Sequence, residues 1–524
     1  MNYDNTFVLI MIGNKAGYKE WLGLAALALP TLLLSIDTSV LYLALPKLSI
    51  SLKAGSGQQL WIMDIYGFMI AGFLITMGNL GDQIGYRKLL IAGSVVFGMS
   101  SILAAFSPNA TLLIMARAIM GTAGAALMPS TLALIRNMFI DPKQLGAAIS
   151  VWMSCFMTGM VAGPLVGGIV LEHYWWGAVF LLGVPVMLII ILFGKILLPE
   201  YSHSKTNRLD IVGVLYSLGG ILPLIYGITE LSRINFQPIS IAAIIAGILF
   251  GLLFIRRERS RTEPIIDYRL FQSKPFRLTL VSMLLTAVIM GGVALFVAQY
   301  LQMVLRFSPF IAGLWMVPQA LAMIVSSLSM QALTKKFSPS IIITIGFIVA
   351  TLGMLSIAFT PVINGLQVLE IGFVISIIGV SPVLILGTGI IISAVPAEKA
   401  GAAASISETG NQLGIALGVA LLGGTGTLIY HIEVMTGLSE DRIPKRILGT
   451  ISESIAGAYA NASGLDIQSR LSMLSVVEGA FVSGLKVVAI LGAATFAVLA
   501  WLTFAWSRAS KRNLQHTITM QIKT

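Results

Sequence analysis

The chain has very few of the residues on which metal and redox sites depend. It contains one cysteine and four histidines in 524 residues. Because a disulfide needs two cysteines, and most protein metal sites draw on Cys and His, we expect neither a disulfide framework nor a metal site. The sequence also lacks a G-x-x-x-x-G-K-[ST] phosphate loop and an H-E-x-x-H metal pair, which argues against ATP hydrolysis and zinc catalysis. We therefore expect no cofactor and no enzymatic activity.

The chain has few charged residues and many long apolar runs. Asp, Glu, Lys and Arg make up 10% of the chain, and hydrophobic residues make up 57%. A helix needs about 20 apolar residues to cross a bilayer. The pattern predicts an all-α integral membrane protein without a sizeable soluble domain. The fourteen predicted spans are residues 21–45, 58–80, 88–107, 111–136, 145–171, 177–198, 209–229, 239–256, 277–301, 309–333, 339–360, 366–394, 401–428 and 477–506.

The distribution of basic residues predicts which end of each span faces the cytoplasm. If the N-terminus is cytoplasmic, most of the 33 Lys and Arg residues fall in inner loops, as the positive-inside rule requires. Both termini are then cytoplasmic. The net charge of +11 follows from this topology, so nucleic acid is not the expected partner. The basic segment 256–261 is first a solvated inner loop, with contact to anionic membrane lipids as a second role.

A glycine-rich stretch in the fifth span indicates a close contact between helices. It reads Gly-Met-Val-Ala-Gly-Pro-Leu-Val-Gly-Gly over residues 159–168. Three of its glycines recur every four residues, so they form one smooth stripe that another helix can approach closely. Its proline predicts a kink. A simple packing seam is the alternative interpretation. The candidate conformational residues here are Gly159, Gly163, Pro164, Gly167 and Gly168.

The inner loop after the second span has an acid at a helix end and bases beyond it. It reads Gly-Asn-Leu-Gly-Asp-Gln-Ile-Gly-Tyr-Arg-Lys over residues 78–88. Gly85 permits a turn, and Asp82 can meet helix N-terminal amides or a nearby arginine, making a latch that holds one conformation. The alternative is an ordinary basic inner loop. The candidate latch residues are Gly78, Asp82, Gly85 and Arg87.

Three charged residues are predicted to share one depth in the membrane. At a rise of ~1.5 Å per residue, Asp37 lies about 10 Å, Asp64 about 6–9 Å and Arg117 about 9 Å below the outer ends of their spans. An arginine inside a span costs roughly 2.5–3.5 kcal/mol on insertion scales and should face an anion in the bundle. We therefore expect one cluster lining an aqueous cavity. The alternatives are a static Asp37–Arg117 ion pair and an arginine that reaches the outer surface.

A carboxylate in such a cluster is a credible proton carrier, because burial disfavours its charged form while the arginine favours it. Glu408 lies about 10 Å from the inner end of its span and is a second candidate. Glu370 is expected to be interfacial. Trp61 and Tyr66 can face a cationic ligand, although Trp61 alone is typical of an interfacial belt. The proton-coupling set is Asp37, Asp64, Arg117 and Glu408. The substrate-binding set is Asp37, Trp61, Asp64, Tyr66, Glu408 and Asn411.

These motifs together resemble the fourteen-span drug:proton antiporter family of the major facilitator superfamily. The resemblance rests on Asp37-Thr38 with Ala44-Leu-Pro46, the segment Trp61–Tyr66, loop 78–88, Arg117, the glycine-proline helix and Arg269-Leu-Phe271. It departs at Gln83 and Tyr86, where the family usually has basic residues, and at Met120, where it has glutamine. The resemblance is strongest to bacterial exporters of quaternary ammonium compounds, cationic dyes and methyl viologen.

The resemblance implies an architecture and a mechanism. The fold would be two six-helix bundles plus two inserted helices. The expected divisions are a cytoplasmic N-terminus (1–20), an N-terminal bundle (21–200), inserted helices and linker (201–276), a C-terminal bundle (277–506) with an outer loop (429–476), and a cytoplasmic tail (507–524). A monomer in the bacterial cytoplasmic membrane would bind lipophilic cations and expel them as protons enter. An importer, an exporter of another metabolite or peptide, and a membrane enzyme or sensor are the alternatives.

Overall fold

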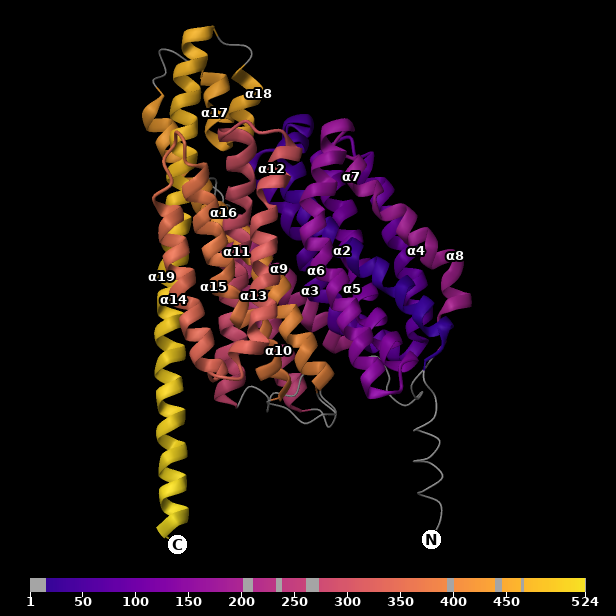
Figure 1. Ribbon diagram of the computed structural model, residues 1–524. Helices are drawn as coiled ribbons and strands as arrows, with labels where there is room; N and C mark the ends of the chain where they lie inside the picture. The colour runs from indigo at the N-terminus through magenta and orange to yellow at the C-terminus, as the bar shows by residue number, and fades with distance from the viewer. Residues whose placement is uncertain are drawn as a thin grey trace, which may run out of the picture. The chain divides into compact units, whose positions relative to one another are not determined.

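The computed structural model is all-helical over the residues that it describes (Figure 1). These are residues 16–200, 211–231, 238–260, 273–393, 400–438, 445–462 and 466–523. Within these residues, helices lie in each of the fourteen predicted spans. In the described part of the chain, eleven helices are long and apolar enough to cross a membrane, or twelve if one bent pair counts as a single span. The prediction of an all-α membrane protein is therefore confirmed.

The chain forms two compact units. The first holds residues 1–262 together with 306–314, and the second holds the remainder. In the first unit α2 packs along α6, and α3 and α4 both pack against α5. The helices of the first unit are α2 (Tyr18–Leu52), α3 (Ser56–Ile84), α4 (Tyr86–Ala105), α5 (Ala110–Met138), α6 (Pro142–His173), α7 (Ala178–Leu181), α8 (Gly183–Leu197), α9 (Ile211–Leu231), α10 (Ile239–Arg259) and α12 (Pro309–Trp315).

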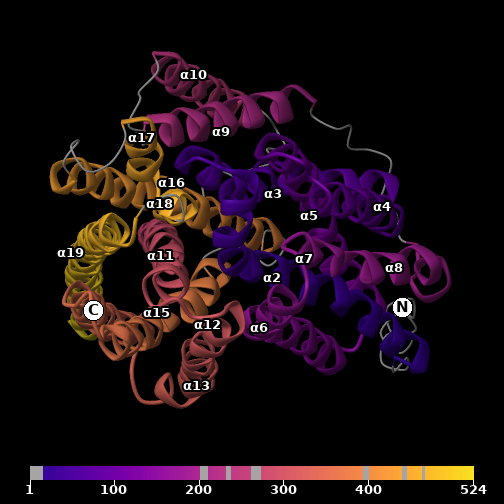
Figure 2. The ribbon, with the colours of Figure 1, turned by 90° about the horizontal axis from the view of Figure 1, so that it is seen from above.

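The two inserted helices, α9 and α10, belong to the first unit and lie side by side (Figure 2). Of the two, α9 packs against α3, the helix that carries Asp64. Most of α10 is exposed, as expected for an apolar helix that faces lipid. The inserted pair is therefore attached to the N-terminal bundle through one of its charged helices.

The second unit pairs α14 with both α15 and α19, and α11 with α16. Its helices are α11 (Lys274–Gln299), α13 (Val317–Leu333), α14 (Pro339–Ala358), α15 (Leu366–Ser393), α16 (Ala400–Gly437), α17 (Lys445–Glu453), α18 (Ile455–Ala462) and α19 (Ile467–Lys523). A π-helical turn, η2 (Tyr300–Val304), continues α11.

The loop predicted at 429–476 is largely helical. Both α16 and α19 continue beyond the length of a single span, and α17 and α18 pack beside their ends (Figure 1). Leu448 and Ile451 form the buried side of α17, whereas Glu453 is exposed. The α17 segment is therefore an amphipathic helix. The Tyr459 hydroxyl oxygen of α18 lies 2.6 Å from the Met303 carbonyl oxygen and 2.8 Å from Oε1 of Glu478 on α19, and its one proton can be donated to either acceptor.

The glycine stripe of α6 is a contact surface for α2. A Cβ atom on Gly159 would lie 2.5 Å from the Leu32 carbonyl oxygen, and Cβ atoms on Gly163 and Gly167 would overlap Ser39 and Val40. Small residues therefore allow the two backbones to approach closely, as the sequence predicts.

The predicted kink is present in α6. The helix bends by 41° between Met160 and Ala162. Pro164 explains the position of the bend, because it has no N–H to donate to the carbonyl four residues earlier, which is that of Met160.

Replacing Gly159 with Val should separate α6 from α2. We expect a loss of about 1–3 kcal/mol in the free energy of unfolding, typical of overpacking, because the new side chain would meet the backbone of α2. The change is measured as a fall in the thermal unfolding midpoint of the purified protein. Gly146→Val is the matched control, since a Cβ at Gly146 on the same helix meets nothing within 4 Å. Equal midpoints for the two variants would contradict the packing role.

Candidate functional site

The charged centre of the first unit is built around Arg117 of α5. Its side chain is 1% exposed. Nη1 lies 3.4 Å from Oδ2 of Asp37 on α2, and Nε donates to the Ile62 carbonyl on α3 at 2.8 Å. The guanidinium therefore connects three helices and does not extend to the outer surface. The expectation that it faces an anion inside the bundle agrees with this geometry.

Two aromatic rings complete the environment of the guanidinium. Its Cζ atom lies 4.9 Å from the ring centroid of Tyr66 and 5.8 Å from that of Phe180. Such cation–π contacts stabilise a charge that has left water. Gly121 makes the arrangement possible, because a Cβ there would lie 2.5 Å from the Tyr66 carbonyl oxygen. Tyr66 was predicted to face a cationic ligand, and one face of its ring is in contact with Arg117.

Asp64 of α3 is more deeply buried than Asp37. It is 1% exposed, and neither carboxylate oxygen accepts a hydrogen bond from any residue that the structure describes. It is electrostatically coupled to Arg117 and to Tyr42 of α2. The three predicted residues are therefore one electrostatic cluster, in which two acids share a single guanidinium. Asp37 makes the direct contact, and Asp64 has no hydrogen-bond partner within the described part of the chain.

Trp61 lies one helical turn from Asp64 on α3, but its side chain faces the inserted helices. Its indole Nε1 donates to Oε1 of Glu230 on α9 at 3.3 Å. Its ring centroid lies 5.8 Å from that of Tyr226, also on α9, and 6.0 Å from that of Phe68. Trp61 thus anchors the inserted pair to α3. The sequence alone gave no sign of this contact, because Glu230 and Tyr226 lie far along the chain.

The single residue between α3 and α4 is the expected turn glycine, and the arginine beyond it meets an acid that was not predicted. Gly85 has φ = +97°, a backbone conformation that favours glycine. Nε of Arg87 lies 3.0 Å from Oε2 of Glu200, which follows α8, and Nη1 donates to the Leu198 carbonyl at 3.0 Å. The structure therefore gives Arg87 the acid partner Glu200. The side chain of Asp82 is outside the described residues.

Gly78 and Gly81 lie in the last turns of α3 and differ in their surroundings. A Cβ on Gly78 would meet nothing within 4 Å, whereas one on Gly81 would overlap the ring of Tyr86. The Tyr86 hydroxyl donates to the Gly78 carbonyl at 3.4 Å. Close packing against Tyr86 therefore explains why residue 81 is a glycine, but it does not explain the glycine at position 78.

The second unit holds the remaining predicted site residues on α16. Gln412 donates to Oε1 of Glu408 at 2.9 Å, one turn along the same helix. Glu408 and Asn411 are both partly buried. Glu408 is thus an acid inside the apolar part of the unit with one amide donor.

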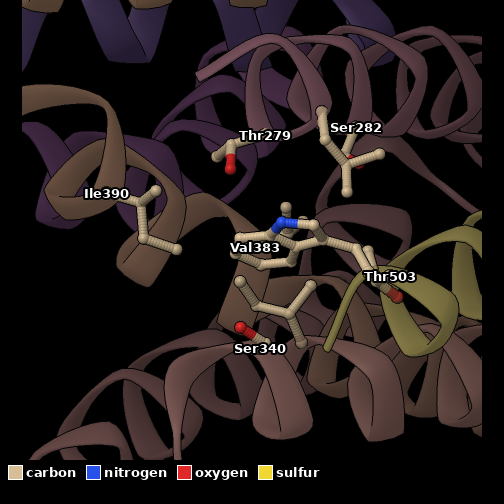
Figure 3. A pocket seen from close by; sticks show the side chains of 9 residues that line it. Thr279, Ser282, Ser340, Val383, Ile390 and Thr503 are labelled. Atoms are coloured by element: carbon tan, nitrogen blue, oxygen red, sulfur yellow. The ribbon is translucent and has the colours of Figure 1, made fainter. Parts of the chain in front are cut away.

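A small pocket in the second unit is separate from these acids. In Figure 3, Thr279 and Ser282 lie on one side of it and Ser340 lies on the opposite side. No acidic residue lines it. The lining residues are Leu278, Thr279, Ser282, Ser340, Ile343, Val383, Ile390, Thr503 and Trp506.

Several polar and aromatic contacts of the site were not predicted. Glu200 and Glu230 are acids at the ends of apolar spans, and this was the available signal for both. Tyr42 and Phe180 gave no signal, because an aromatic residue in an apolar helix is ordinary. Glu370 was expected to be interfacial; it is near one end of α15, but it is only 5% exposed.

Comparison with known proteins agrees with this architecture. The family model described as Major Facilitator Superfamily matches residues 27–419. The chain therefore belongs to the major facilitator superfamily, and it is a membrane transporter rather than an enzyme.

Curated proteins of similar sequence include multidrug efflux and drug resistance proteins. It is 37% identical to the multidrug efflux pump LfrA of Mycolicibacterium smegmatis, over 91% of this chain and 94% of that protein. It is 32% identical to the methyl viologen resistance protein SmvA of Salmonella typhimurium, over 89% and 94% of the two chains. A crystal structure of a bacterial homologue of the human lysosomal transporter Spinster shares the fold, with a TM-score of 0.67, 15% identity and coverage of 94% and 98%.

Removing Arg117 should leave Asp37 buried without its ionic partner. We expect Arg117→Gln to lower the free energy of unfolding by about 3–5 kcal/mol, the usual penalty for breaking a buried ion pair. Adding Asp37→Asn should restore at least about 0.5 kcal/mol, because the contacting residues are coupled. Thermal unfolding of the wild type, both single variants and the double variant measures the coupling. Strictly additive losses would show that the pair is not the stabilising contact.

Proposed function

We propose that this protein is a proton-coupled multidrug efflux antiporter of the bacterial cytoplasmic membrane. It would export lipophilic cations such as quaternary ammonium compounds, cationic dyes and viologens, as a monomer with both termini in the cytoplasm. The similarity to a multidrug efflux pump and to a methyl viologen resistance protein supports this substrate class. The excess of basic residues in the predicted inner loops supports the orientation.

The observation that carries the proposal is the charge balance around Arg117. Of the two buried acids, Asp37 pairs with the guanidinium, and Asp64 lies within its electrostatic influence. A guanidinium can neutralise one carboxylate, and a second ionised carboxylate in a low-dielectric site is costly without a further positive charge. A proton or a cationic substrate supplies that charge. The cluster is therefore suited to bind one or the other.

Competition between the two ligands accounts for exchange. When a proton occupies Asp64, the carboxyl is neutral and attracts a cation weakly. When the proton leaves, the carboxylate attracts a lipophilic cation, and the ring of Tyr66 offers a cation–π contact once Arg117 moves from it. Proton entry from outside then releases the substrate by mass action. Each charge that crosses the membrane is worth about 2.3 kcal/mol per 100 mV.

The close α2–α6 contact gives the N-terminal unit a rigid element for this cycle. Asp37 lies midway between Ser35 and Ser39, which face the glycines of α6. At about 100° per residue, Asp37 is on the opposite side of α2 from both serines. We propose that Arg87, Glu200 and the turn at Gly85 form the inner latch, with Asp82 as a second acid. Glu408 and Asn411 would provide a further cation or proton site in the second unit.

Proton exchange can be tested in inverted membrane vesicles. After a pH gradient is established, addition of ethidium should dissipate part of it in vesicles that contain the wild-type protein. Asp37→Asn and Asp64→Asn should each abolish this response, because neither amide can carry the exchanged proton. A pH-sensitive dye follows the gradient.

The exposed carboxylate of Glu453 on α17 provides the control, and Glu453→Gln should respond like the wild type. If both aspartate variants dissipate the gradient normally, the carboxylates are not the coupling groups. A response to neutral or anionic compounds but not to cations would favour a different exporter.

A further inference from the structure

Glu370 is a membrane acid that does not belong to the cluster around Arg117, and the exchange described above does not use it. It is the only charged residue of α15. Its side chain is 5% exposed, and neither carboxylate oxygen accepts a hydrogen bond from the described residues. It follows the first residue of α15 by four positions, so it lies about 6 Å from that end of the helix. In the orientation proposed above, this is the outer end.

The register of α15 shows which face carries Glu370. Gly372 and Gly379 are contacts of α14, because Cβ atoms there would lie 2.9 Å from the Gly353 carbonyl oxygen and 2.7 Å from that of Gly346. At about 100° per residue, Glu370 is roughly half a turn away from both glycines. Its Cα therefore lies on the face of α15 that is turned away from α14. Two hydroxyl residues, Ser381 and Thr388, fall on that same face.

Within the described helices that pack against α15, no basic residue lies near the end that carries this acid. The helices that pack against α15 are α11, α13, α14 and α16. The segments α13 and α14 contain no charged residue. On α11 the charged residues are Lys274 and Arg277, and Arg277 is about 33 Å from the opposite end of that helix, where Tyr300 continues it.

One histidine is among the remaining titratable groups of these neighbours, and its ring contacts α17. Apart from Tyr300, they are Glu408, Tyr430, His431 and Glu433 on α16. The imidazole Nδ1 of His431 is already within 3.2 Å of the Ser452 carbonyl. Lys486 is on α19, which packs against α14, α16 and α11. Among the residues that the structure describes, Glu370 thus has no ion pair comparable to that of Asp37 with Arg117.

A carboxylate in this position is stable when it is neutral and unstable when it is charged. Burial without a counter-charge or a hydrogen-bond donor disfavours ionisation. Membrane acids of this kind are rare and are associated with proton relays and substrate paths. The distance of about 6 Å to the helix end is short enough for a proton to arrive from that side.

We propose that Glu370 is a proton-binding residue of the second unit, loaded from the outer side during exchange. The proposal rests on the proton-coupled export proposed above. A proton from the outer solution forms the O–H bond of the carboxyl group, and the neutral side chain is compatible with the packed helices. The O–H bond breaks when water reaches the group during the cycle, and the proton leaves toward the cytoplasm.

Tetraphenylphosphonium uptake into inverted vesicles tests this role, with the lumen about one pH unit more acidic than the bath and the membrane potential clamped. Each coupled proton multiplies the accumulation ratio by about ten for each pH unit. Glu370→Gln, which removes one proton site while preserving shape, should lower the accumulation ratio about tenfold. Exchange of labelled for unlabelled tetraphenylphosphonium without a gradient should remain within about twofold of the wild type.

Two further variants separate proton binding from a structural role. Glu370→Asp keeps a carboxyl group and should retain gradient-driven accumulation, and the exposed Glu453→Gln should behave like the wild type. Wild-type accumulation in Glu370→Gln overturns the inference. Loss of gradient-free exchange in this variant also overturns it, because that points to packing or substrate contact. If the wild type neither exchanges nor accumulates the cation, the proposed function fails and this inference fails with it.

Discussion

The arrangement of the N-terminal unit depends on the burial of one guanidinium. Arg117 is almost fully removed from water, so its charge and its donors must find partners among the helices around it. It finds a carboxylate on α2, a backbone carbonyl on α3 and two aromatic rings. These contacts fix the distance between three helices at one depth. Any movement of α2 or α3 relative to α5 changes the environment of this charge.

Close backbone packing allows the contacts to form. Gly121 brings α5 against the backbone at Tyr66, and the glycine stripe of α6 brings α6 against α2. The α6 contact uses Ser35 and Ser39, which leaves Asp37 on the other side of α2. The helix α2 thus has one face of small residues that packs against α6 and an opposite face that carries Asp37. The apolar surroundings make both faces effective, because lipid gives helices no hydrophobic reason to associate and small residues provide the van der Waals contact instead.

The membrane acids of the two units have different partners. In the first unit Asp37 has a direct cation, and Asp64 shares the electrostatic influence of that cation. In the second unit Glu408 has an amide donor, and Glu370 has neither a donor nor a cation among the described residues. An acid with a fixed counter-charge can remain ionised, whereas an acid without one requires a mobile positive charge. This difference connects the fold to the proposed exchange of protons and cationic substrates.

The sequence by itself determined the features that depend on local composition. Apolar length predicts the helices, glycine spacing predicts the α2–α6 seam, and Pro164 predicts the bend. The cost of a buried arginine predicts that Arg117 faces an anion, and helix rise places Asp37 at its depth. Tertiary structure alone decided that Trp61 contacts Glu230, that Arg87 pairs with Glu200, and that Glu370 is buried rather than exposed at an interface. Periodicity and hydropathy describe one helix at a time, whereas the partner of a side chain depends on how distant helices cross and rotate against each other.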